Sequence, residues 1–186
     1  MHAFWRHSNN TIKFKITVMQ AVLFSKILFG LESAELTAGA LRALDTFHLK
    51  CLRKILKMKT TFIERANSNE EVYRRAREAL GQGKVIKPLS ELFLERKQKF
   101  FKQVVVAEEG NPIRDITFVG NSMKPHTHFP RRVGRPRANW ARKEGARIWD
   151  KSQKGQRPPI PYDENSEMQG EEIRRLAKEE NKKRKR

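Results

Sequence analysis

Apolar residues recur with the period of an α-helix along most of the chain up to about residue 107. Over 13–29 they fall three and four positions apart, and Gly30 supplies a C-terminal stop. The predicted stripe consists of Phe14, Val18, Ala21, Val22, Ser25, Leu28 and Phe29. The opposite side also carries apolar residues, among them Ile16 and Met19. The pattern therefore predicts a helix that is apolar on most faces and is buried centrally or packed against a partner.

A second helix is predicted over about 37–58, and its C-terminal part is strongly basic. Its apolar stripe consists of Leu41, Leu44, His48, Cys51, Leu52, Ile55 and Leu56. The remaining positions are largely cationic, and cations near a helix C-terminus suit the negative end of its dipole. The candidate phosphate contacts on this helix are Lys50, Arg53, Lys54 and Lys57. A charged face that only meets solvent is the alternative.

Two further helices are predicted before residue 107. The stretch 67–80 opens with Ser68, followed by Glu70 and Glu71, which matches a capping box and predicts a helix that starts at Ser68 and ends at Gly81. A longer helix is predicted within 84–107, where Pro88 is tolerated only in the first turn.

Beyond Ala107 the chain changes character, because Gly, Pro and Asn become frequent and no period persists. A short helix is predicted over 137–150, and the residues after Lys151 have the composition of a disordered or loosely helical charged tail. The predicted fold class is all-α, a small thumb-like helical bundle followed by an irregular basic region. The predicted divisions are 1–12 as an irregular lead-in, 13–107 as the helical domain, 108–150 as the basic irregular region and 151–186 as the tail.

The charge balance indicates an anionic partner. Lys and Arg number 40 against 21 Asp and Glu, a formal net charge of +19 over 186 residues. Such an excess attracts RNA, DNA or an anionic membrane surface, although basic tails can also serve solubility alone. No apolar run reaches the roughly 20 residues that a membrane span requires, so a membrane partner is not expected. A single cysteine, Cys51, excludes a disulfide framework and a multi-cysteine zinc site.

A second group of candidate contacts lies in the segment RRVGRPRANW, residues 131–140. Its Gly-Arg-Pro core is similar to that of an AT-hook, in which an arginine enters the minor groove of DNA. Val133 stands where that motif has a basic residue, and the segment occurs once, so general phosphate contact is the favoured interpretation. The predicted contacts are Arg131, Arg132, Arg135 and Arg137, with Trp140 as a stacking platform for a base.

The sequence offers little for catalysis or for metal binding. It has no Gly-rich phosphate loop, no nucleophile-elbow motif and no His-Glu-x-x-His pair, and its four aspartates are isolated. His126 and His128 lack further ligands nearby in the sequence. No cofactor, no metal and no enzymatic activity are therefore expected. The terminal Lys182, Lys183, Arg184, Lys185 and Arg186 fit a nuclear-import signal or a solvated tail.

Taken in order, several segments resemble the region downstream of the polymerase core in reverse transcriptases of LINE-type (non-LTR) retrotransposons. The matching segments are KITVMQAVLFSKILFGLES (15–33), LRALDTFHLKCLRKILKM (41–58), ERANSNEEVYRRA (64–76), LFLERKQKFFKQVV (92–105) and GRPRANWARKEGARIWD (134–150). The resemblance covers about three-quarters of the chain and rests on the order of short motifs. It implies a helical thumb followed by a basic region that handles template RNA and target DNA.

The chain departs from that family where catalysis would lie. It has no Asp-Asp pair, which the family's palm motif contains, and TTFIER (60–65) stands where the family often has a tryptophan. The resemblance therefore implies a non-catalytic nucleic-acid-binding fragment of retrotransposon origin, in the nucleus or in a cytoplasmic ribonucleoprotein. It also implies that helix 13–29 self-associates or meets a palm-like partner. The alternatives are a basic structural subunit of a ribonucleoprotein and an expressed remnant without selected function.

Overall fold

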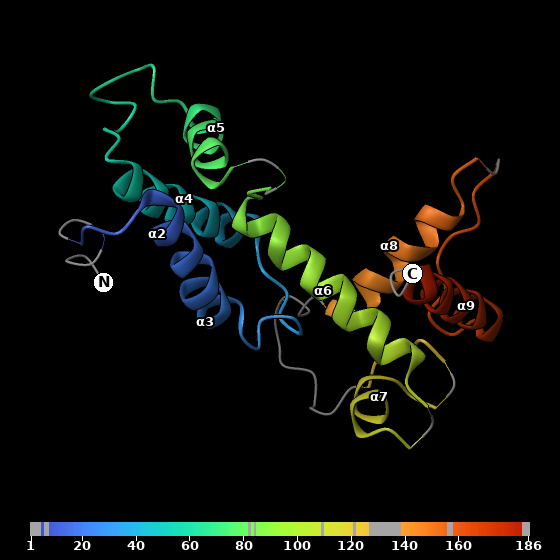
Figure 1. Ribbon diagram of the computed structural model, residues 1–186. Helices are drawn as coiled ribbons and strands as arrows, with labels where there is room; N and C mark the ends of the chain where they lie inside the picture. Colours follow the sequence, from blue (N-terminus) through green and yellow to red (C-terminus); the bar gives the residue numbers. More distant parts are fainter. Residues whose placement is uncertain are drawn as a thin grey trace, which may run out of the picture. The chain divides into compact units, whose positions relative to one another are not determined.

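In the computed structural model, the residues described are 5, 8–81, 83, 85–108, 110–120, 122–126, 139–155 and 158–183. They form helices and no β-strand, apart from one isolated bridge between Phe118 and Pro125. The all-α prediction is thus confirmed. The α-helices, labelled in Figure 1, are α2 (Ile12–Val18), α3 (Ser25–Leu28), α4 (Ala38–Leu56), α5 (Asn69–Leu80), α6 (Leu89–Val106), α7 (Pro112–Thr117), α8 (Trp140–Ser152) and α9 (Glu167–Lys183). A π-helix, η1 (Met19–Phe24), joins α2 to α3.

The chain divides into two compact units, and the division differs from the predicted boundary at residue 107. Unit 1 comprises Met1–Glu32 and Leu36–Glu95, and unit 2 comprises Ser33–Glu35 and Arg96–Arg186. The division falls inside α6. Its first part buries Leu89 and Phe93 in the core of unit 1, whereas its second part buries Phe101 and Val104 in the core of unit 2. The apolar residues of α6 follow one continuous helical period although they enter two different cores. Periodicity in the sequence therefore does not indicate the boundary between the two units.

The predicted helix over 13–29 is present as α2, η1 and α3, but its predicted stripe is buried only in part, at Leu28 and Val18. Phe14 is 49% exposed and Phe29 is 86% exposed, while Ile16 and Met19 are fully buried. The helix contains the π-helical segment η1, in which hydrogen bonds join residues five apart. Met19 and Phe24, five positions apart, are both buried in the core of unit 1. In an uninterrupted α-helix, two side chains five positions apart would point in different directions.

The helix ends of unit 1 follow the capping signals of the sequence. The Thr37 hydroxyl accepts a hydrogen bond from the Ala40 amide at 3.2 Å, and the Ser68 hydroxyl accepts one from the Glu71 amide at 3.2 Å. The helix α6 lies within the predicted 84–107 and begins directly after Pro88, which therefore precedes the first turn. Each cap satisfies a backbone N–H that the first helical turn leaves without an intrahelical acceptor.

In unit 2 the helix predicted over 137–150 is present as α8, and the tail, expected to be disordered or loosely helical, contains the packed helix α9. The helix α9 buries Ile173 and Ala177 in the same core as Trp149 of α8. The indole Nε1 of Trp149 donates to the Ile160 carbonyl at 2.8 Å and so ties the segment between the two helices to α8. The short helix α7, which was not predicted, starts at Pro112 behind an Asn111 cap. Of the two alternatives expected for 151–186, the structure has a helix over Glu167–Lys183, and this helix packs into the core of unit 2.

A buried histidine forms part of the core of unit 1. His48 is fully buried, and its ring packs edge-on against Phe24, with ring centroids 4.8 Å apart. The Tyr73 hydroxyl lies 3.5 Å from its Nδ1. Burial lowers the pKa of His48 from 6.5 to about 4, and the nearby Asp45 offsets this only in part. The imidazole is therefore neutral in the folded state at physiological pH.

This histidine makes unit 1 sensitive to mild acid. Because the folded pKa lies below that of the unfolded chain, acidification favours the unfolded state between pH 6.5 and about 4. Lowering the pH from 7 to 5 should cost about 2 kcal/mol of unfolding free energy. Denaturant titrations of His48→Gln should show a correspondingly smaller loss over this interval. An equal loss in both proteins would contradict the assignment.

Candidate nucleic-acid interface

The exposed side of α4 carries the clearest concentration of cations in unit 1. Arg42, Lys50 and Lys54 are exposed and lie within about a third of a turn of one another at the helical 100° per residue. Lys57 follows at the C-cap, in the left-handed conformation with φ 56°, and is also exposed. We call these four residues the basic face of α4. None of them forms an ion pair within the part of the chain that the structure describes.

The one acid of α4, Asp45, is a helical neighbour of Arg42, but its carboxylate is bound to α6 and not to the cations of the basic face. Asp45 accepts a hydrogen bond from the Ser90 amide at 2.9 Å and another from the Ser90 hydroxyl at 2.7 Å. Ser90 lies in the first turn of α6, where backbone N–H groups lack helical acceptors and a negative charge is favourable. The carboxylate thus caps α6 and does not neutralise the cations of the basic face.

Several arginines on the other helices are paired with carboxylates of the same helix. On α5 the Glu71 carboxylate contacts both Arg74 and Arg75, and these arginines lower the pKa of Glu71 to about 2. On α9, Arg175 contacts Glu172 at 2.6 Å and Glu179 at 2.9 Å. Such i, i+3 and i, i+4 pairs contribute little stability on an exposed surface. They do, however, reduce the positive potential that these helices present to an anion.

Of the four predicted contacts on α4, Arg53 has a structural role. It is half-buried, and its Nη2 donates to the Asn67 carbonyl at 3.3 Å and to Asn69 Oδ1 at 2.9 Å. These bonds tie the end of α4 to the start of α5. Lys50, Lys54 and Lys57 project into solvent. The structure therefore brings three of the four predicted residues to one surface. It adds Arg42, which is not among the contacts predicted from the sequence.

Trp140, the predicted stacking platform, packs within unit 2. Its ring lies 5.4 Å from that of Phe100 and 6.0 Å from that of Phe101, centroid to centroid. It remains partly exposed at the start of α8. One side of the indole is thus already used by the protein, which limits the area open to a base.

The remaining predicted contacts fall largely outside the described residues. Arg131, Arg132, Arg135 and Arg137 lie outside them, as do Arg184, Lys185 and Arg186 of the import candidate. Lys182 and Lys183 end α9 and are exposed.

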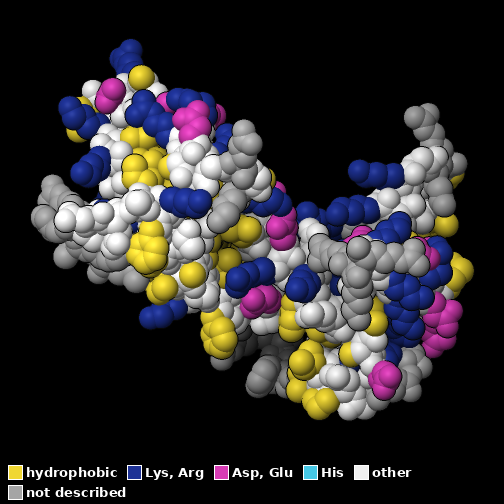
Figure 2. Space-filling model, in the orientation of Figure 1, with side chains coloured by type: hydrophobic (Ala, Val, Ile, Leu, Met, Phe, Trp, Pro, Cys, Tyr) yellow, Lys and Arg dark blue, Asp and Glu magenta, His cyan; other side chains and the backbone are white. Residues whose placement is uncertain are grey.

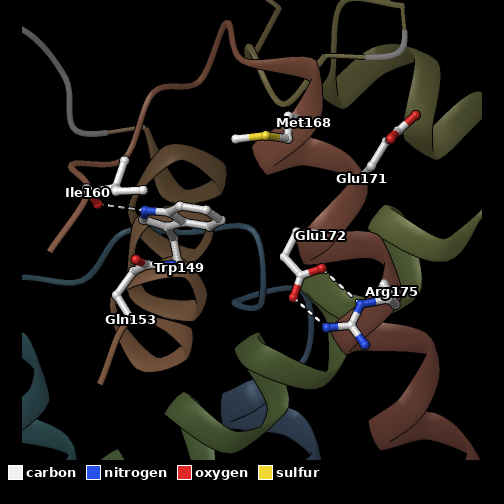
Figure 3. Close-up of a pocket in the computed structure, with 7 residues that line it drawn as sticks. All are labelled: Trp149, Gln153, Ile160, Met168, Glu171, Glu172 and Arg175. Atoms are coloured by element: carbon white, nitrogen blue, oxygen red, sulfur yellow. Dashed lines mark hydrogen bonds and ion pairs between the residues drawn. The ribbon is translucent and has the colours of Figure 1, made fainter. Parts of the chain in front are cut away.

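A hollow of about 490 Å³ in unit 2 is unsuited to phosphate. Figure 3 shows Trp149 and Met168 on its wall, with the Arg175 guanidinium turned toward Glu172. Glu171 also lines it, so carboxylates outnumber the one arginine, which is already paired. Among the described residues, no group of three or more His, Cys, Asp or Glu side chains is placed to hold a metal ion, and no helix is long and apolar enough to cross a membrane.

Comparison with protein-family models, with curated proteins and with solved structures finds no match to this chain.

The different roles of Arg53 and Lys54 can be separated by experiment. Replacing Arg53 with Ala should lower the unfolding free energy by roughly 1–2 kcal/mol, because the Asn67 carbonyl and Asn69 lose a charged donor. Lys54→Ala, the matched control one residue away, should change it by less than about 0.5 kcal/mol, because Lys54 is exposed. Denaturant unfolding monitored by circular dichroism measures both. Equal effects would refute a structural role for Arg53.

Proposed function

We propose that this chain is a non-catalytic nucleic-acid-binding protein that contacts the phosphates of RNA or DNA through the basic face of α4. The observation that carries the proposal is that Asp45, the one acid of α4, is bound to Ser90 and forms no ion pair with the cations of that face. Exposed lysine and arginine side chains without ion pairs neutralise phosphates and release counterions, which favours association. Contacts of this kind carry little sequence preference.

The net charge of +19 supports the proposal at longer range. Positive potential over a surface raises the local concentration of a polyanion and accelerates its association. The arginines at 131, 132, 135 and 137 and the basic C-terminus add to that potential whatever their conformation. They are proposed as auxiliary phosphate contacts, and the terminal cluster as a nuclear-import signal.

We further propose that the chain derives from the thumb and downstream region of a LINE-type reverse transcriptase. The resemblance supports this through the order of its segments. The helices α4, α5 and α6 overlap three of these segments, 41–58, 64–76 and 92–105. The absence of an Asp-Asp pair supports a binding role without polymerase activity. The exposed Ile12, Phe14 and Phe29 are the residues through which self-association or a palm-like partner is proposed.

Salt dependence tests the proposed interface. The double variant Lys50→Ala/Lys54→Ala should reduce the slope of log affinity against log salt by about 1.4 to 1.8, because each phosphate contact contributes about 0.7 on single strands and 0.9 on duplex DNA. Fluorescence anisotropy with labelled RNA and DNA over a salt series measures the slope.

The control is Lys13→Ala/Lys26→Ala, which removes the same charge from exposed positions of α2 and α3 in the same unit. Its slope should stay close to that of the unsubstituted protein. Equal slopes for both double variants, or no salt-dependent binding by the unsubstituted protein, would contradict the proposal.

A further inference from the structure

The segment between α4 and α5 presents an aromatic side chain almost entirely to solvent. Phe62 is 97% exposed, and the adjacent Ile63 is 66% exposed. Single exposed apolar residues are common on protein surfaces. Phe62 and Ile63, however, are adjacent at the tip of one loop that follows the basic face of α4, and together they form a small exposed apolar patch.

The loop that carries these residues is held in one conformation by hydrogen bonds. The amides of Ile63 and Glu64 both donate to the Thr60 carbonyl at 3.0 Å, which closes a turn around Phe62. Asn67, only 2% exposed, donates through Nδ2 to the Lys59 carbonyl at 3.0 Å and so closes the loop. Arg53 in turn donates to the Asn67 carbonyl. The exposed ring is therefore presented by a braced loop.

The charges around the loop tip are predominantly positive. Lys57, Lys59 and Arg65 are all exposed, and Figure 2 shows blue and yellow side chains together over the segment between α4 and α5. The one acid among residues 57–66 is Glu64, whose Oε2 accepts a hydrogen bond from Asn67 Nδ2 at 3.0 Å. The loop thus combines an exposed aromatic face with a rim of cations.

This combination matches a ligand whose negative charges alternate with flat apolar faces. Unpaired nucleotides have that chemistry, since each couples a phosphate to a base whose faces are open for stacking. In a duplex the base faces are covered by their neighbours, so an aromatic side chain gains little there. We propose that the loop 57–66 binds a single-stranded segment of nucleic acid, with Phe62 stacked on a base and Lys57, Lys59 and Arg65 on the flanking phosphates. This inference rests on the proposed function and specifies its ligand.

The test compares single-stranded and duplex ligands. A thymidine oligonucleotide with one central 2-aminopurine and a blunt duplex of the same length are titrated with the unsubstituted protein and with Phe62→Ala. The variant should bind the single strand roughly five- to a hundredfold more weakly and should lose the quenching of 2-aminopurine that stacking causes. Its affinity for the duplex should change less than about twofold, and Phe62→Trp should restore single-strand binding.

Val85→Ala is the control, because Val85 is another largely exposed apolar residue of unit 1 and lies before α6, outside the loop 57–66. It should bind both ligands as the unsubstituted protein does, and thermal unfolding should show that neither alanine variant is destabilised.

Unchanged single-strand binding by Phe62→Ala, or an equal loss of affinity for both ligands, would overturn this inference and leave the proposed function standing. Binding to phosphatidylserine vesicles is measured as well. If Phe62→Ala weakened binding to the vesicles but not to the single strand, the loop would be a membrane contact and the inference would be overturned. No salt-dependent binding of either oligonucleotide by the unsubstituted protein would overturn the proposed function as well.

Discussion

The two hydrogen bonds that Asp45 accepts from Ser90 determine what α4 presents to solvent. They join the middle of α4 to the first turn of α6, and they place the only carboxylate of α4 at a site where backbone donors need an acceptor. The buried side of α4, with His48, Leu52 and Ile55, then faces the core of unit 1. What remains outside is a row of cations without a carboxylate among them.

The same arrangement recurs in the loop that follows. Glu64 is hydrogen-bonded to Asn67, and Asn67 is in turn bonded to Arg53, so an acid and a cation are both used to brace the backbone. The cations left at the surface are Lys57, Lys59 and Arg65. Elsewhere, on α5 and α9, carboxylates contact the arginines of the same helix. The positive potential of unit 1 is therefore set by where its few acids are bound as much as by the number of its lysines.

Local signals in the sequence were sufficient for the helices but not for their packing. Thr37 and Ser68 cap helices where the sequence predicts a start, because capping depends on a few neighbouring residues. The buried face of the first helix was predicted correctly at Leu28 but not at Phe14 or Phe29, and the π segment within it was not predicted. Asn111 before Pro112 is a start signal for α7 that could have been recognised.

The packing of α9 was not predictable, since Ile173 and Ala177 are a sparse apolar stripe among charges and their burial depends on distant residues. The cationic residues of α4 were identifiable from spacing, whereas the role of Arg53 and the exposure of Phe62 required coordinates.

The central claim is that phosphates meet the basic face of α4, and lysine footprinting tests it most directly. The protein is acylated with and without a saturating oligonucleotide, and the modification of each lysine is quantified by mass spectrometry. Lys50, Lys54 and Lys57 should be protected and should regain reactivity at high salt, while the exposed Lys13 and Lys26 should react equally in both samples. Uniform protection of all exposed lysines, or protection confined to Lys182 and Lys183, would contradict the account.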